Sequence, residues 1–154
     1  MKSYEQAYKL ILKNARMFNS KTRTQEVSLL SAVGMVLAED MYSPFALPGF
    51  DKAAMDGYAV RSCDTKKSPV VLKCIGCIQA GEIFKKIVKQ GECVKIMTGA
   101  AIPQGADAIV MREYTAQTKE NRVKILKSAK KPDHICFRGE NMRKGEKILK
   151  KGTP

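Results

Sequence analysis

Apolar residues near the start of the chain recur at three- and four-residue intervals, the spacing of one face of an α-helix. The members of this stripe are Tyr4, Ala7, Tyr8, Ile11, Ala15 and Phe18. Ser3 stands just before the stripe and Gln6 follows three residues later, which is the spacing of a capping box. The polar stretch 19–25 interrupts the pattern. We therefore predict an amphipathic helix between Ser3 and this stretch.

A second, shorter apolar group follows the polar stretch and predicts a short helix. The group begins near Ser28 and consists of Leu29, Leu30, Ala32 and Val33. Gly34 comes directly after it, and glycine readily adopts the left-handed conformation that ends many helices. We expect the helix to end at Gly34 and residues 35–42 to be extended.

From residue 43 onward, short apolar runs alternate with glycine and proline turns, a pattern typical of strands. The predicted strands are residues 58–61, 69–75, 92–97, 107–112, 122–126 and 147–149. Because no long helical pattern separates them, we expect an antiparallel barrel or sandwich-like domain. The predicted fold class is α+β, mainly β. The β-rich domain at 44–145 is inserted after a small helical linker region, formed by 1–43 plus 146–154.

The charge of the chain is strongly positive, with 28 lysines and arginines against 15 acidic residues and a formal net charge of +13. Such a field attracts polyanions, either nucleic acid or a phosphorylated small molecule. The lysines are spread through turns and strand edges, and the sequence contains no Trp to stack on bases. We favour a solvated lysine-rich surface over a dedicated nucleic-acid partner, and keep a basic nucleic-acid-binding β-barrel as an alternative.

Targeting signals are absent from the printed sequence. It has no apolar run of the roughly 18 residues that a membrane span needs, and no basic-then-apolar signal at its start. We therefore expect a cytoplasmic protein without a membrane partner. Cys74 and Cys77 have zinc-knuckle spacing, but no second such pair follows and His134 is far away. We favour structural cysteines, with Cys74 buried in a strand, over a metal site.

The first loop with chemical potential contains Asp56 followed by Gly57. A carboxylate beside a glycine can ligate a hard cation such as Mg²⁺ or accept a hydrogen bond from a substrate. Asp before Gly also commonly caps its own turn, and from local chemistry alone this reading is the more frequent one. Both interpretations stay open at this point.

Two further loops carry polar groups beside glycines. In the second, Thr98 and Gly99 leave a strand, and backbone N–H groups around a glycine suit a phosphate or pyrophosphate. The alternative is a hairpin whose Thr98 satisfies its own turn. In the third, Arg138 can contact an anion in two-pronged fashion and Glu140 can bind a metal. An Arg–Glu surface pair is the more frequent outcome.

Three strings in this order resemble the N-terminal signatures of the MoeA family of molybdopterin molybdenumtransferases. They are PGFDKAAMDGYAV at 48–60, VKIMTGAAIPQGADAIVMRE at 94–113 and FRGENMRKGEKILKKGT at 137–153. The resemblance implies a homodimeric enzyme of molybdenum cofactor biosynthesis. That enzyme inserts molybdenum from molybdate into adenylylated molybdopterin with Mg²⁺ and releases AMP. A MogA-type adenylyltransferase activity would precede it.

The same resemblance implies a division of the chain and its limits. Residues 1–43 plus 146–154 correspond to an incomplete region I and residues 44–145 to region II. The α/β molybdopterin-binding region and the C-terminal barrel of the family are absent from the 154 residues. We expect the full-length protein to be the enzyme and this fragment alone to be inactive. A non-catalytic scaffolding module of the same family is the alternative.

The resemblance also assigns roles to residues that match the family's motifs. It implies catalytic roles for Asp56 and Thr98, and substrate binding by Lys52, Gly57, Gly99 and Arg138. The implied metal ligands are Asp56, Glu140 and Glu113. Asn141 stands where relatives commonly have Asp, and an amide lacks the carboxylate's charge.

Overall fold

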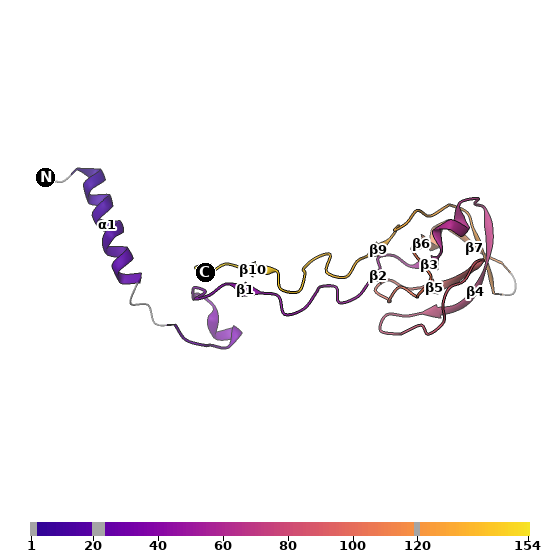
Figure 1. Cartoon of the computed structure of the whole chain (residues 1–154), viewed down its shortest axis with the longest axis horizontal. Helices are drawn as coiled ribbons and strands as arrows, with labels where there is room; N and C mark the ends of the chain where they lie inside the picture. The colour runs from indigo at the N-terminus through magenta and orange to yellow at the C-terminus, as the bar shows by residue number, and fades with distance from the viewer. Residues whose placement is uncertain (1–2, 20–23, 119–120) are drawn as a thin grey trace. The chain divides into compact units, whose positions relative to one another are not determined.

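A computed structural model describes residues 3–19, 24–118 and 121–154 of the chain, without the side chains of residues 16–19. The chain divides into two compact units (Figure 1). Unit 1 comprises Met1–Met41 and Ile148–Pro154, and unit 2 comprises Tyr42–Lys147. Within the described part of the chain, no helix is both long and apolar enough to cross a bilayer.

Unit 1 contains the predicted first helix, α1 (Tyr4–Asn19). Its capping box forms as expected: the Ser3 backbone N–H donates to Gln6 Oε1 at 3.1 Å, and the Gln6 N–H donates to Ser3 Oγ at 3.3 Å. The apolar stripe is exposed along its described part, where Tyr4 and Tyr8 stack at 6.2 Å between ring centroids. The Phe18 side chain lies outside the described residues.

The second predicted helix is a single 3₁₀ turn, η1 (Leu29–Ala32), and Gly34 follows it with a φ of +82°. Of the predicted extended stretch 35–42, only Met41–Tyr42 forms a strand, β1, which pairs with β10 (Lys147–Leu149). Leu37 exchanges backbone hydrogen bonds with the other end of unit 1. Its N–H donates to the Thr153 carbonyl at 2.9 Å and its carbonyl accepts from Gly152 at 2.8 Å.

Unit 2 is built on one six-stranded sheet in the order β6-β3-β5-β4-β8-β7. The strands are β3 (Gly57–Val60), β4 (Val70–Ile78), β5 (Glu92–Ile96), β6 (Ala108–Met111), β7 (Thr115–Gln117) and β8 (Arg122–Ile125). The 3₁₀ turns η2 (Ser62–Thr65) and η3 (Arg112–Tyr114) lie between them. The predicted mainly β, largely antiparallel fold is confirmed, with one departure: β4 and β5 are parallel, so the sheet is mixed. The other neighbouring strands are antiparallel.

The middle of this sheet is buried on both faces: alternate residues of a strand point to opposite sides, and all four residues of β3 are buried. Tyr58 and Val60 of β3 belong to one apolar cluster with Leu72, whereas Ala59 between them belongs to a second cluster with Ile96. The sheet therefore packs against one apolar cluster on each face. The cluster that contains Ala59 also includes the loop residues Val88 and Ala100.

A β-bulge in β4 moves this strand from one cluster to the other. Cys74 is in register with Cys93 and Cys77 with Lys95, so β4 holds one residue more than β5 over this stretch. Gly76 occupies the bulge, where a Cβ would lie 2.7 Å from the Phe84 ring. The bulge leaves Cys74 only partly buried, which corrects the prediction that it is a buried strand residue.

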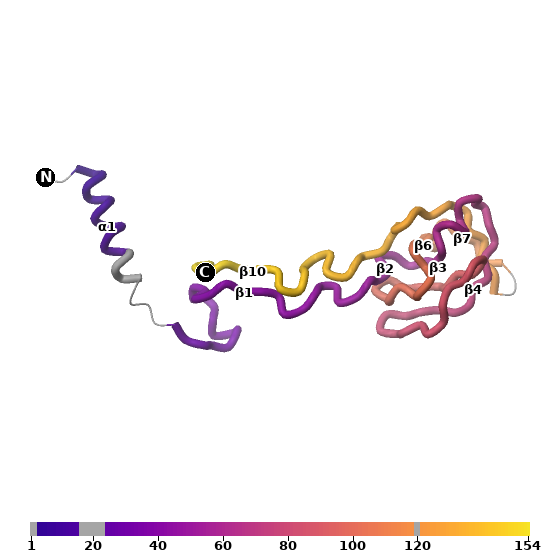
Figure 2. The backbone as a smooth tube through the Cα atoms, in the orientation of Figure 1, coloured from indigo at the N-terminus to yellow at the C-terminus, as the bar shows by residue number. Residues whose placement is uncertain are grey.

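A two-stranded ladder of β2 (Lys52–Ala53) and β9 (Ile135–Cys136) completes unit 2. Neither strand was predicted, because a two-residue strand carries no periodicity. The segments on either side of this ladder run next to each other, as Figure 2 shows for residues 42–55 and 134–147. Ser43 donates to the Glu146 carbonyl at 2.8 Å, and Leu47 donates to the Met142 carbonyl at 2.8 Å.

Replacing Gly57 by Ala should destabilise unit 2, because a Cβ there would lie 2.1 Å from the backbone carbonyl oxygen of Val110. Overpacking of this kind costs about 1–3 kcal/mol. Gly49→Ala is the matched control, since its nearest contact would be 4.0 Å away, and we expect a change within about 0.5 kcal/mol. Urea unfolding measures both variants. Equal midpoints for the two would contradict the close packing of β3 against β6.

Candidate functional site

The turn that carries Asp56 and the turn that carries Thr98 meet directly. Asp56 Oδ1 accepts hydrogen bonds from the Thr98 backbone N–H at 2.8 Å and from Thr98 Oγ1 at 2.6 Å. These bonds, followed by the positive charge of Arg112, lower the pKa of Asp56 below its usual 3.8. The carboxylate is exposed and ionised at neutral pH. It does not act merely as a cap of its own turn, and Thr98 does not merely satisfy its own hairpin.

Strand register explains why these residues meet. Gly57 is aligned with Ile96 on β5 and with Met111 on β6. Asp56 therefore lies just outside the sheet, beside the residues that leave β5 and β6. Its carbonyl accepts a hydrogen bond from the Arg112 N–H at 3.1 Å, which fixes the backbone that carries the carboxylate.

The loop after β5, which carries Thr98, is hydrogen-bonded to β2. The Gly99 N–H donates to the Ala53 carbonyl at 2.8 Å, and the Ala53 N–H donates to the Ala100 carbonyl at 2.9 Å. The Ala100 N–H donates to the Met97 carbonyl at 3.0 Å. The backbone donors of residues 98–100 are thus all engaged within the chain. The prediction of a phosphate cradle formed by these N–H groups is wrong, because the loop uses them to hold Asp56 and β2.

The loop that carries Arg138 and Glu140 is hydrogen-bonded to Asp51, close in sequence to β2. Asp51 Oδ1 accepts a hydrogen bond from the Arg138 backbone N–H at 2.8 Å, and the Asp51 carbonyl accepts one from Ile102 at 3.0 Å. Glu140 Oε2 accepts the Phe137 N–H at 2.8 Å, so this carboxylate closes its own turn. Among the described residues, Arg138 and Glu140 form no ion pair, although such a pair was the more frequent expectation.

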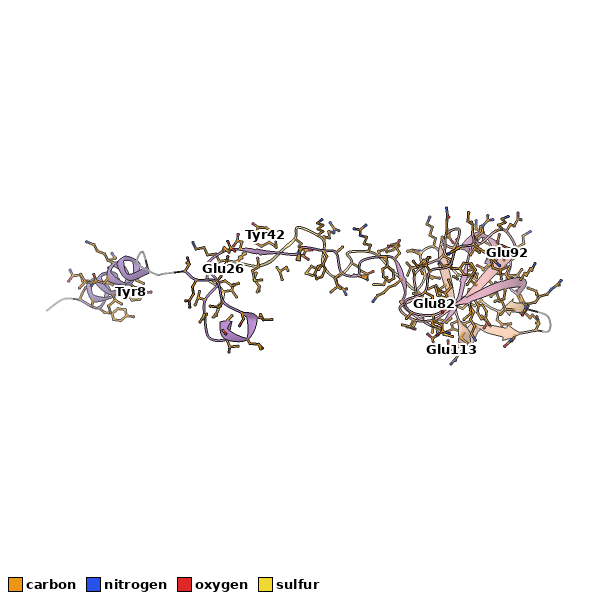
Figure 3. All side chains as sticks on the ribbon, turned by 90° about the horizontal axis from the view of Figure 1, so that it is seen from below. Tyr8, Glu26, Tyr42, Glu82, Glu92 and Glu113 are labelled. Atoms are coloured by element: carbon orange, nitrogen blue, oxygen red, sulfur yellow. The ribbon has the colours of Figure 1, made fainter. Side chains whose placement is uncertain are left out.

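The remaining predicted residues occupy different settings. Lys52 is half-buried in β2, and Gly99 has a φ of +83°. Glu113 is exposed in η3, and Figure 3 shows it on a different part of unit 2 from Glu92. Over the described ranges, no three His, Cys, Asp or Glu side chains come together as a metal-binding group. Asp56 is therefore not joined by Glu113 and Glu140 in one ligand set.

Comparison with known proteins decides the family. The sequence model of the MoeA N-terminal region (domain I and II) matches residues 2–154. The chain belongs to the MoeA N-terminal region family. Its structure is similar to the crystal structure of the molybdopterin biosynthesis MoeA protein from Pyrococcus horikoshii OT3, with a TM-score of 0.78 and 39% identity. That similarity covers 84% of this chain and 35% of the other.

Curated relatives of this MoeA region carry the name molybdopterin molybdenumtransferase. The protein from Staphylococcus aureus (strain Mu50) is 40% identical over 130 residues, covering 82% of this chain and 31% of the relative. The Bacillus subtilis (strain 168) protein is 38% identical over 143 residues, covering 88% of this chain and 33% of the relative. The chain thus spans about a third of the length of these relatives.

Sequence reasoning did not identify Asp51 and Arg112 as parts of this MoeA site. Asp51 lies in the same string as Asp56, but its partner Arg138 is 87 residues away. Arg112 follows directly after β6 and contacts Asp56 only because β3 and β6 are in register. The strand ends provided the only sequence signal, because polar residues just outside neighbouring strands tend to meet at one edge of the sheet.

Removing the Thr98 hydroxyl should raise the pKa of Asp56, because the side-chain hydrogen bond is the largest cause of its low value. We expect a higher pKa in Thr98→Val and a nearly unchanged one in Thr98→Ser, which keeps the donor. Carbon-detected NMR titration of the carboxyl group measures both. Because the pKa of Asp56 is lower in the folded than in the unfolded state, its ionised form stabilises the fold at any pH above the unfolded pKa. This stabilisation is lost as the pH falls through the folded-state pKa. An identical pKa in the Val variant and the wild type would contradict this assignment.

Proposed function

We propose that this chain forms the N-terminal part of a molybdopterin molybdenumtransferase that acts in molybdenum cofactor biosynthesis. The complete enzyme would transfer molybdenum from molybdate to adenylylated molybdopterin and release AMP. Membership of the MoeA N-terminal region family supports this proposal, together with relatives of that name. The observation that carries it is the contact between Asp56 and Thr98, which holds an ionised carboxylate at the surface of unit 2.

The charge of Asp56 defines what the site can do. A bare carboxylate repels phosphate and pyrophosphate, so a cation has to lie between Asp56 and an anionic substrate. Mg²⁺ fits this donor, because proteins commonly hold it with one or two carboxylates together with substrate phosphates and water. Asp56 is the residue that would hold it, and the bound ion would stabilise charge that develops as the phosphoanhydride is cleaved.

Thr98 acts on this site through Asp56. Its hydroxyl proton is committed to Asp56 Oδ1, so it orients the carboxylate and leaves its own lone pairs as acceptors. Its backbone N–H adds a second bond to the same oxygen. One carboxylate oxygen is thereby fixed, which points the other toward the ligand. Lys52 of β2 and Arg138 of the loop after β9 are the cationic side chains that would contact the substrate's anionic groups.

The assembly proposed for the complete protein is a cytoplasmic homodimer that receives its substrate from a MogA-type adenylyltransferase activity. In this arrangement the present chain supplies one wall of the cleft, and the remaining two thirds of the relatives' length supply the molybdopterin-binding part. The scaffolding and nucleic-acid alternatives have less support, because relatives that match most of this chain bear the transferase name.

Asp56→Asn in the complete protein should lower turnover by roughly 100-fold or more, the loss typical when one preorganised electrostatic group is removed. Thr98→Val should lower it by about 10-fold, as for a residue that orients a ligand, and Thr98→Ser should stay near wild type. AMP release measures turnover, and thermal unfolding checks that each variant folds. Wild-type rates in Asp56→Asn would exclude the proposed role of this carboxylate.

The 154-residue chain by itself should show no molybdenum insertion, because it holds only the part of the site described above. Adenylylated molybdopterin, molybdate and Mg²⁺ are incubated with the chain, and both AMP and molybdenum cofactor are quantified. The complete protein under the same conditions is the positive control. Turnover by the isolated chain would show that the remaining length is dispensable.

A further inference from the structure

A surface groove of about 560 Å³ follows the second half of β4. The consecutive residues 73–77 of this strand line it, and Lys86, Lys95 and Asn121 form the rest of its lining. Because alternate residues of a strand point to opposite sides, a groove lined by consecutive residues runs along the edge of the strand and not over one face. The groove is separate from the Asp56–Thr98 contact, since neither of those residues lines it.

On the side of β8, the edge of β4 is open beyond Cys74. β8 pairs with Val70–Lys73, and a last bond from the Cys74 N–H to the Asn121 carbonyl, at 2.7 Å, ends the ladder. On its other side β4 stays paired with β5 up to Ile78. Within the described ranges, no strand pairs with residues 75–78 on the side of β8. The backbone groups of such an edge are a template for another strand.

The loop that connects β4 to β5 does not use this edge. Its residues bond elsewhere: the Val88 N–H donates to the Gln104 carbonyl at 2.8 Å, and the Glu82 N–H donates to the Gln79 carbonyl at 3.1 Å. No backbone hydrogen bond joins residues 75–77 to a loop residue in the described part of the chain. The loop instead contributes Lys86 to the groove lining, so it forms a wall and leaves the strand edge accessible.

The groove is strongly cationic. Lys73, Lys86 and Lys95 line it, and none of the described lining residues is acidic. No ion pair joins these lysines to a carboxylate of a described residue. Glu92 is in register with Lys73, but its carboxylate accepts the Lys89 backbone N–H at 3.0 Å and does not line the groove. An occupant of the groove therefore meets positive charge without a competing acid in its walls.

The positive charge lies on both sides of the sheet. Leu72 belongs to the cluster that contains Tyr58, so the next residue, Lys73, points to the opposite face. Lys95 stands between Val94 and Ile96, which belong to the cluster that contains Ala59, so Lys95 points to the face of Leu72. A strand added along this edge would meet a lysine above the sheet and another below it. Acidic side chains on both of its faces would complement them.

We propose that this edge of β4 binds an acidic, extended peptide segment of a partner protein as an additional strand. Backbone hydrogen bonds to residues 75–78 supply affinity in this mode of recognition, and side chains supply specificity. The lysines exclude a second copy of this chain, because its net charge of +13 would bring like charges together. An acidic segment converts the same repulsion into attraction, so charge selects the partner.

The test measures binding of three labelled eight-residue peptides to the 154-residue chain by fluorescence anisotropy. The first repeats Glu-Glu-Thr-Val, which places acid on both faces of a strand. The second replaces every Glu by Gln, and we expect it to bind at least about fivefold more weakly, because several exposed ion pairs are lost. The third keeps Glu but is N-methylated at two adjacent central residues, so each edge loses a donor. It should bind about tenfold more weakly or worse.

Lys73→Gln with Lys86→Gln should weaken binding of the acidic peptide about fivefold or more, since both charges line the groove. The matched control is Lys66→Gln with Lys67→Gln, which removes the same charge from exposed residues that precede β4. It should leave the affinity within about twofold, because salt screens exposed charges beyond about 10 Å. Thermal unfolding checks that all four substitutions leave the fold intact.

Amide hydrogen exchange with mass spectrometry locates the bound strand. We expect the acidic peptide to slow exchange at residues 75–78 in the wild-type chain. The proposal fails if the acidic peptide shows no saturable binding, if its N-methylated form binds equally well, or if both lysine pairs lose affinity equally. Unchanged exchange at 75–78 on binding contradicts it as well. Exchange there that slows with protein concentration alone would assign the edge to a second copy of the chain and overturn the proposal.

Discussion

The alignment of β3 between β5 and β6 is the constraint on which unit 2 depends. Gly57 faces Ile96 on one side and Met111 on the other, and the Val110 carbonyl approaches so closely that no larger residue fits. This alignment closes the middle of the sheet. It also fixes Asp56 at the point where the chain leaves β5 and β6. Core packing and the candidate site thus share one structural origin.

The alternation of exposed and buried residues in β8 leaves this strand little freedom to slip. A shift of one residue would turn Val123 and Ile125 from the core toward solvent. β4 differs, because its bulge at Gly76 exchanges the two sides within a single strand. The bulge lets the strand serve both clusters. The bulge also places Cys74 and Cys77 in the lining of a surface groove that Lys73, Lys86 and Lys95 share.

The candidate site gathers three loops, and β2 is the element that unites them. Ala53 bonds to the loop after β5 through both its N–H and its carbonyl, while Asp51 accepts the backbone N–H of Arg138 from the third loop. The glycine-containing loops that resemble phosphate cradles in sequence use their donors for these internal bonds. The ionised carboxylate of Asp56 therefore remains the main polar group that this surface offers to a ligand.

The sequence by itself determined the elements whose signals are local. The capping box of α1 and the strands β3, β4, β5, β6, β8 and β10 follow from residue spacing alone, because the i, i+3 and alternating patterns describe contacts within a few residues, whereas β7 was not predicted. The motif strings identified the family and named Asp56 and Thr98, but whether each would satisfy its own turn stayed open. Tertiary structure decided that they bond to each other, that β4 runs parallel to β5, and that β2 and β9 exist. These depend on pairings between residues far apart in the chain, such as Cys74 with Cys93 and Asp56 with Thr98, and no local pattern records which partner the chain will meet.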